Sequence, residues 1–105
     1  MPPLWRASIH SEEVGRAADL LERRYSISII VASHEGASRF NEFRQAIGPI
    51  PPGTLATRLA ELEEAGLLTR TVVDARPPRV EYPLTERGRR LERVIAALRI
   101  WAATA

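Results

Sequence analysis

The feature that most constrains this chain is a pair of short helical patterns on either side of the turn 48–51, Gly-Pro-Ile-Pro. The first pattern begins after Ser38, a suitable N-cap residue, and ends at Gly48. Its apolar face consists of Phe40, Phe43 and Ile47. The second pattern begins at Pro52, which suits a first helical position, and ends at Gly66. Its apolar stripe consists of Leu55, Leu59 and Leu62. Two helices joined by such a turn form a helix-turn-helix pattern.

A hairpin pattern follows the second helix directly. Residues 67–73 and 80–84 predict two strands, and residues 74–79 predict the loop between them. Pro83 has no N–H to donate to a sheet and therefore suits an edge strand. A two-stranded ribbon in this position is a wing. The pattern therefore predicts a winged helix-turn-helix, which is a mainly α fold with a small β-hairpin.

Further patterns flank this central unit on both sides. Ser11 is a suitable cap for a first amphipathic helix that reaches to about Arg24. Thr85 is a suitable cap for a last helix over about residues 86–103. Residues 25–34 contain enough β-branched side chains for a strand and are long enough for a buried helix. The pattern alone leaves these two alternatives open.

Length and composition indicate one globular domain over residues 1–105. The chain is 45% hydrophobic and 27% charged, which is typical of globular proteins. No apolar run approaches the roughly 18–20 residues of a membrane span, and the first residues lack the order of a secretory signal. We therefore expect a cytoplasmic protein with no membrane partner. Because the chain has no cysteine, disulfides, thiolate nucleophiles and cysteine-ligated metals are excluded.

Basic charge is concentrated in the segment that contains the predicted wing. Residues 1–66 carry seven arginines and nine acidic residues, a net −2, whereas residues 67–93 carry seven arginines and four acidic residues, a net +3. All fifteen basic residues are arginine. The guanidinium group suits phosphates and guanine edges better than a point charge does. A GC-rich genome accounts for the arginine bias as a whole, and its physical consequence is a set of side chains suited to phosphate and guanine.

The chain resembles the HxlR-type winged helix family over about residues 11–102. The matching stretches are residues 39–43 (RFNEF), 55–67 (LATRLAELEEAGL), Arg70, 76–82 (RPPRVEY), 84–88 (LTERG) and Trp101. Many winged helices contain a sequence like that of residues 59–67, so the order of all these stretches is the more specific signal. The resemblance implies that residues 27–33 are helical, and that the protein is a homodimeric transcription regulator.

The chain departs from the family pattern at three places. Many relatives carry an N-terminal cysteine that senses oxidants or electrophiles, and its absence here removes thiol-based sensing. The usual Gly-Lys-Trp before the second helix appears as residues 23–25, Arg-Arg-Tyr. Pro51 stands where serine is common, and it has no side-chain oxygen to cap the following helix.

The predicted recognition helix, about residues 52–65, supplies the first candidate DNA contacts. In a helix-turn-helix the N-terminal part of this helix enters the major groove. Its outward surface contains Gly53, Thr54, Thr57 and Arg58. Arg58 is the candidate for a bidentate contact to guanine. The alternative for Arg58 is an intrahelical ion pair with Glu61, three residues later.

Three further arginines are candidate contacts to the DNA backbone. Arg39, at the start of the preceding helix, is placed for a phosphate, with a solvated surface charge as the alternative. Arg76 and Arg79 flank Pro77-Pro78 at the wing tip. Proline stiffens the tip, and arginine there suits phosphates or a narrow minor groove.

The apolar face of the last helix is either part of the core or the candidate dimer interface. A chain of this length has little core for a terminal helix to cover within one copy. The interface candidates are Leu4, Trp5, Leu91, Val94, Ile95, Leu98 and Trp101. A two-fold dimer would present two recognition helices and favour a pseudo-palindromic double-stranded site.

Other functions remain as alternatives. A winged helix that binds proteins instead of DNA would share the fold, and the net charge of only +2 is a weak field for DNA. A MarR- or PadR-like regulator is a closer alternative.

An enzyme is not expected, because His34 and Glu35 have no nucleophile or orienting group beside them in the pattern. The sequence shows no cofactor loop or metal cluster, and it leaves the identity of any effector open; a small apolar ligand between the dimer helices is a hypothesis.

Overall fold

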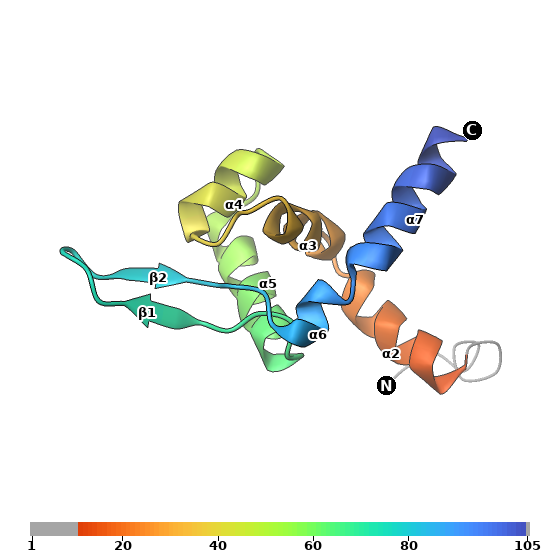
Figure 1. Cartoon of the computed structure of the whole chain (residues 1–105), viewed down its shortest axis with the longest axis horizontal. Helices are drawn as coiled ribbons and strands as arrows, with labels where there is room; N and C mark the ends of the chain where they lie inside the picture. Colours follow the sequence, from red (N-terminus) through yellow and green to blue (C-terminus); the bar gives the residue numbers. More distant parts are fainter. Residues whose placement is uncertain (1–10, 105) are drawn as a thin grey trace.

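The computed structural model of the protein describes residues 11–104 and is mostly helical, with one antiparallel hairpin. Its elements in chain order are α2 (Glu12–Leu21), α3 (Ser26–His34), α4 (Phe40–Ile47), α5 (Pro52–Glu64), β1 (Thr71–Val73), β2 (Arg79–Glu81), α6 (Glu86–Arg89) and α7 (Glu92–Ala103). The hairpin projects from one end of the molecule, and α2 and α7 lie at the other (Figure 1). Within the described part, no helix is long and apolar enough to cross a membrane.

Residues 26–34 form the buried helix α3, as the family resemblance implies. Tyr25 precedes the helix in a left-handed conformation with φ 75°, so the chain turns sharply between α2 and α3. Ile29, Ile30 and Ala32 are all buried. The packing of these side chains against the neighbouring helices outweighs the preference of β-branched residues for strands.

Helix α4 begins one residue later than the sequence predicts. The prediction that Ser38 caps this helix is wrong, because the N-cap residue is Arg39. The side chain of Arg39 makes no capping hydrogen bond. The carboxylate of Glu42, at the third position of the helix, accepts hydrogen bonds from the backbone N–H of Ser38 at 3.0 Å and of Arg39 at 2.9 Å. Glu42 therefore satisfies the free N–H groups before the helix, a role usually shared with a capping hydroxyl.

Helix α5 has the boundaries that its sequence predicts. Pro51 is the N-cap residue, with no side-chain hydrogen bond, and Pro52 occupies the first helical position. Gly66 follows the C-cap with φ 81°, a left-handed conformation that glycine adopts without strain. The three leucines of the predicted stripe are at most 1% exposed.

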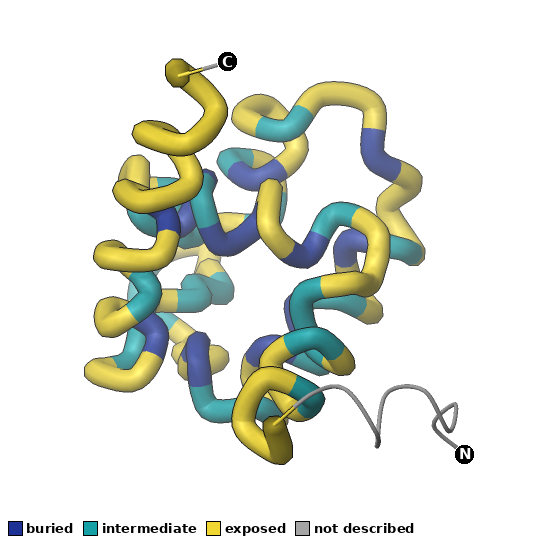
Figure 2. Tube along the Cα trace, turned by 90° about the vertical axis from the view of Figure 1, so that its right-hand side faces the viewer, coloured by how far each residue is buried: buried dark blue, intermediate teal, exposed yellow. Residues whose placement is uncertain are grey.

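The hydrophobic core lies between α3, α4 and α5 and extends to the start of the wing and to α7. Its buried members are Ile29, Ile30, Ala32, Phe43, Ile50, Leu55, Leu59, Leu62, Leu67, Leu68 and Ile95. Figure 2 shows the buried segments facing inward, whereas the last turns of α7 are exposed. This core holds α5 from one side only, which leaves its opposite surface in solvent.

The wing strands are shorter than predicted. They pair with Val72 opposite Val80, and a single bridge joins Leu68 to Leu84 nearer the core. Tyr82 interrupts the ladder because its N–H donates to the carbonyl of Ser38 at 2.7 Å. The placement of Arg79 in the loop is also wrong, since Arg79 is the first residue of β2 and is paired with Val73.

The C-terminal segment forms two helices instead of the single helix predicted over about residues 86–103. Thr85 caps α6, accepting from Gly88 N–H at 3.0 Å and donating to the carbonyl of Gly66 at 2.5 Å. A Cβ built at Gly88 would lie 2.2 Å from the carbonyl oxygen of Leu67, so α6 rests directly on the start of the wing. The helix ends after one turn, and α7 then starts at Glu92.

Candidate nucleic-acid interface

The N-terminal half of α5 presents a small, polar, exposed surface. Gly53 and Thr57 are exposed and Thr54 is half-buried, as expected from the inward direction of the leucines. Thr57 Oγ1 donates to the carbonyl of Gly53 at 3.0 Å. The hydroxyl of Thr57 still has acceptor capacity, and nothing larger than threonine projects from these positions. The backbone of this surface is therefore open to close approach by a partner.

Arg58 is held against the protein by two hydrogen bonds. Its Nε donates to the carbonyl of Arg24 at 2.9 Å, and a terminal nitrogen donates to Glu61 at 2.9 Å. The other carboxylate oxygen of Glu61 pairs with Arg23. The Arg58 side chain is only 19% exposed. The intrahelical ion pair that the sequence offered as an alternative is thus present, and it joins α5 to the segment before α3.

Arg39 is an exposed arginine at the start of α4. Its guanidinium lies 3.5 Å from a carboxylate oxygen of Glu42, and its side chain is 52% exposed. The backbone hydrogen bonds from Arg39 and Ser38 hold the pKa of the Glu42 carboxyl below its ordinary value, and the nearby guanidinium acts in the same direction. Glu42 is therefore a stable anion, and only part of the positive charge of Arg39 remains available to a partner.

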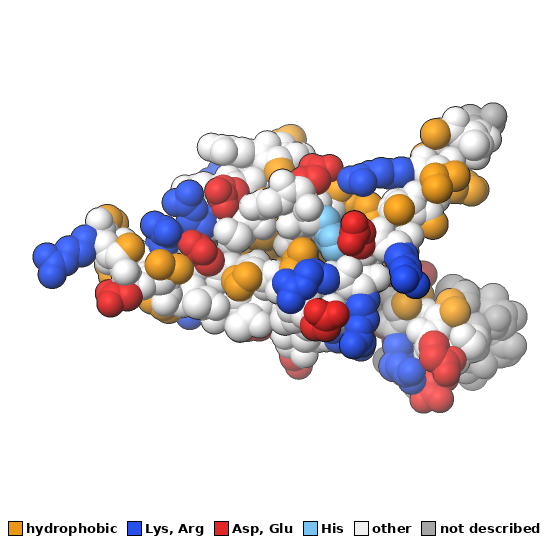
Figure 3. Space-filling view, in the orientation of Figure 1, with side chains coloured by type: hydrophobic (Ala, Val, Ile, Leu, Met, Phe, Trp, Pro, Cys, Tyr) orange, Lys and Arg blue, Asp and Glu red, His pale blue; other side chains and the backbone are white. Residues whose placement is uncertain are grey.

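The two wing arginines differ in their surroundings. Arg76 is exposed in the loop, and within residues 11–104 its side chain has no hydrogen bond or ion pair. Arg79 lies on β2, where its Nε donates to Glu81 at 3.0 Å. Figure 3 shows a basic side chain projecting from the end of the wing. Arg76 is thus the more available of the two charges.

Sequence reasoning missed a polar hollow beside the turn of the helix-turn-helix. It has a volume of about 330 Å³, and its lining residues are Asn41, Arg44, Gln45, Gly48, Pro49 and Ile50. Arg44 is exposed and makes no side-chain ion pair with any described residue. The helical spacing gave no signal for it, because Arg44 lies four residues after Phe40 and three before Ile47, at the edge of the apolar face of α4. It sits on the helix that precedes α5.

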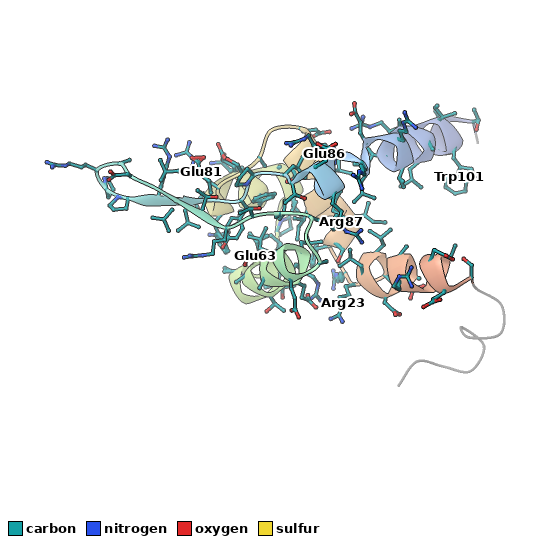
Figure 4. The ribbon with its side chains drawn as sticks, turned by 60° about the horizontal axis from the view of Figure 1, so that its bottom comes forward. Arg23, Glu63, Glu81, Glu86, Arg87 and Trp101 are labelled. Carbon is teal, nitrogen blue, oxygen red and sulfur yellow. The ribbon has the colours of Figure 1, made fainter. Side chains whose placement is uncertain are left out.

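The predicted dimer residues separate into two groups. Ile95 is buried in the core of one copy, and Leu91 is half-buried against the same core. In contrast, Val94, Leu98 and Trp101 are 44%, 43% and 77% exposed. Ile100, not predicted, is 67% exposed. Figure 4 shows Trp101 near the C-terminal end of α7.

The exposed face of α7 continues into an apolar groove. Its lining residues are Leu21, Ile27, Ile30, Leu91, Val94, Ile95 and Leu98. The remaining interface candidates, Leu4 and Trp5, lie outside the described residues. Residues 11–104 contain no group of three or more histidine or acidic side chains arranged to hold a metal ion.

The sequence of residues 20–105 matches the family model described as HxlR-like helix-turn-helix. The chain belongs to the HxlR-like helix-turn-helix family. The family resemblance seen in the sequence is thereby confirmed, and so is the winged-helix fold, since solved regulators superpose on this HxlR-like chain.

Curated relatives of this HxlR-like chain are described as uncharacterized HTH-type transcriptional regulators. YtfH of Escherichia coli is 40% identical over 78 residues, which are 74% of this chain and 62% of YtfH. YvaP of Bacillus subtilis is 33% identical over 87 residues, which are 83% of this chain and 81% of YvaP. The chain thus spans less than two thirds of the length of YtfH and most of the length of YvaP.

Solved structures of transcription regulators share the fold. The reduced form of YodB from B. subtilis superposes with a TM-score of 0.79 at 34% identity, covering 90% of this chain and 92% of YodB. A putative HTH-type regulator, ytcD, gives a TM-score of 0.82 at 30% identity and covers 90% of this chain and 96% of its own. A regulator from Enterococcus faecalis described as of the MarR family also superposes, with a TM-score of 0.77 at 28% identity over 91% of this chain and 89% of its own. A regulator described as of the MarR family therefore has a similar fold, and the family match assigns this chain to the HxlR-like group.

Proposed function

We propose that this HxlR-like protein is a sequence-specific, double-stranded DNA-binding transcription regulator that acts in the cytoplasm as a homodimer. The observation that carries the proposal is the N-terminal half of α5, in which Gly53 and Thr57 are exposed and Thr54 is half-buried. It stands next to a wing with an unpaired arginine at its loop (Figure 1). Membership of a family whose relatives are described as HTH-type transcriptional regulators supports the same function.

The proposed contacts follow from which side chains are free. Gly53, Thr54 and Thr57 face the major groove, where threonine reads bases or holds phosphates. Arg58 reaches a guanine only after its pairing with Glu61 opens. Arg76 contacts the phosphate backbone or the minor groove. The further phosphate contacts are Arg39, Arg44 and Arg79, of which Arg44 has no competing described carboxylate.

The homodimer is supported by apolar surface that one copy leaves uncovered. The side chains of Val94, Leu98 and Trp101, spaced at i, i+4 and i+7 on one face of α7, are each more than two fifths exposed. Large contiguous apolar patches on a soluble protein usually mark an interaction site. A second copy packed there by two-fold symmetry covers the same patch on both protomers, with Leu4 and Trp5 as proposed additional contacts. The two recognition helices then face a pseudo-palindromic operator.

The test is fluorescence anisotropy of a labelled duplex from the DNA upstream of the protein's own gene, measured with the full chain. A scrambled duplex of the same length and base composition is the control, and both are titrated over a salt series. We expect preferential binding to the upstream duplex that weakens as salt rises, because counterions are released from the phosphates. Equal binding of both duplexes would support DNA binding and contradict the proposed preference for the upstream sequence.

Absence of binding to either duplex at low salt would overturn the proposal. The fold would then serve as a protein-interaction module, which remains the second candidate because the net charge of +2 is small for a DNA-binding domain. No cofactor or metal takes part in the proposed function, and no reaction is assigned to the protein.

A further inference from the structure

A second groove lies between α2, the start of the wing and α6 with the residues that join α6 to α7. It has a volume of about 370 Å³. That lies within the range of small-molecule sites, roughly 300–1,000 Å³. Its apolar lining consists of Ala17, Leu20, Leu21, Leu67 and Leu91. None of the DNA-contact candidates lines it.

The rim of this groove is positively charged. Arg16, Arg87 and Arg90 line it together with one acidic residue, Glu13, so three positive charges and one negative charge leave a net +2. Arg16 pairs with Glu12 at 3.1 Å. Figure 3 shows basic side chains gathered over α6 and the adjacent end of α2.

Arg87 and Arg90 are the two rim charges without a protein partner. Within residues 11–104 neither side chain has a hydrogen bond or an ion pair. The methylene stem of Arg87 passes over Gly66, where a built Cβ would lie 3.6 Å from Arg87 Cδ, and this contact limits where the guanidinium is placed. In Figure 4 Arg87 lies where α6 approaches α2. Two guanidinium groups thus stand at the mouth of an apolar hollow, with no described carboxylate bound to them.

We propose that this groove binds a small organic acid with an apolar body, the carboxylate paired with Arg87 and Arg90 and the body against Leu20, Leu67 and Leu91. Guanidinium groups bind carboxylates through charge-assisted, often bidentate hydrogen bonds. Burial of the apolar body supplies the remaining affinity. Because α2 and α6 line the groove and Leu91 immediately precedes α7, a ligand there lies beside the start of the helix that the proposed dimer uses.

The test is an NMR titration of the full chain, labelled at its leucine methyl groups, without DNA. The probes are octanoate and 2-naphthoate, and their neutral amides serve as matched controls. We expect saturable shifts of the methyl signals of Leu20, Leu67 and Leu91 with a carboxylate, and at least about tenfold weaker binding of its amide, since the amide loses the charge-assisted pair. Because no DNA is present, the result is independent of the proposed DNA binding.

A double variant and a single variant test the location of the site, and a third variant serves as the control. The double variant Arg87→Gln/Arg90→Gln should weaken carboxylate binding by about tenfold or more, whereas Arg93→Gln, an exposed arginine of α7 outside the groove, should leave it unchanged. Ala17→Trp fills the groove from an exposed helix position and should abolish binding while the fold is retained, as circular dichroism would show.

Three outcomes would overturn the proposal. One is the absence of saturable shifts with both carboxylates. Another is equal affinity for a carboxylate and its amide, which would show that Arg87 and Arg90 do not bind the charge of the ligand. The third is an equal loss of affinity in Arg93→Gln and in the double variant, which would reduce the effect to overall charge.

Discussion

The guanidinium of Arg58 donates a hydrogen bond of 2.9 Å to the carboxylate of Glu61, one turn later on the same face of α5. The arginine best placed to read a base is therefore occupied in the free protein. Glu61 also pairs with Arg23, so a single carboxylate binds two arginines beside the N-terminal half of α5. The proposed contact of Arg58 with DNA would require that its pairing with Glu61 open.

Replacing Glu61 should strengthen DNA binding. In Glu61→Gln the ion pairs with Arg58 and Arg23 are lost, and both arginines become available to phosphates or bases. Partly exposed ion pairs contribute up to about 1 kcal/mol, so we expect the affinity for DNA to rise by about two- to fivefold in the anisotropy assay. The control is Glu64→Gln, which removes the same charge from an exposed position of α5. An equal gain in both variants would mean that only net charge matters.

Removal of the wing arginine should weaken binding to all duplexes alike. Arg76→Ala deletes an exposed charge at the wing loop, and we expect a lower affinity for upstream and scrambled DNA together. The slope of log affinity against log salt should fall by about 0.9 for one lost phosphate contact. Arg93→Ala, at an exposed position of α7, is the matched control and should change neither quantity. An unchanged slope in Arg76→Ala would argue against a backbone contact by the wing.

The two groups of residues on α7 should respond differently to truncation. Trp101→Ala removes an exposed ring from the proposed dimer interface, so sedimentation velocity should show dissociation while the unfolding transition of the monomer is little changed. Ile95→Ala removes a buried side chain from the core of one copy, and it should lower the free energy of unfolding by about 2–5 kcal/mol. A dimer that withstands Trp101→Ala would place the interface elsewhere.

The contact between α6 and the wing base should not tolerate a methyl group. In Gly88→Ala the new Cβ would lie 2.2 Å from the carbonyl oxygen of Leu67 and 2.9 Å from Leu84 Cδ2, so α6 must move. Overpacking of this kind costs about 1–3 kcal/mol of unfolding free energy, measurable by urea denaturation. The control is Gly15→Ala on α2, because a Cβ built at Gly15 meets nothing within 4 Å. Helix propensity predicts a small stabilisation for that change.

Glu42 should make stability depend on acid pH. Hydrogen bonds from the backbone of Arg39 and Ser38 lower the pKa of this carboxyl from its ordinary value of 4.5. A carboxyl whose folded-state pKa is depressed contributes stability above its unfolded pKa, and the contribution is lost as pH falls through the folded value. The urea midpoint should therefore fall less steeply below pH 4.5 in Glu42→Gln than in the wild type. An equal pH dependence in both proteins would contradict this role of Glu42.

Much of the interface surface could be predicted from the sequence because it depends on local periodicity. The spacing of Leu55, Leu59 and Leu62 determines which side of α5 is buried, and therefore which side carries Gly53 and Thr57. Glycine and proline at the turn and at the helix ends act through backbone geometry within a few residues. Ser11, Thr85 and Pro52 accordingly occupy the positions that the sequence predicts.

The state of each charged side chain was decided by tertiary structure. Arg58 donates to the carbonyl of Arg24, which is 34 residues earlier, and no local pattern reports such a contact. Residues 26–34 are helical because the surrounding helices bury them, although their own propensity is divided. The close approach of Gly88 to Leu67, which sets α6 against the start of the wing, likewise joins residues far apart in the sequence. The sequence by itself determined the helix-turn-helix, the wing and the outward face of α5, since these follow from short-range geometry. Only the packed structure decided which arginines are engaged and which are free, because that depends on groups distant in the chain.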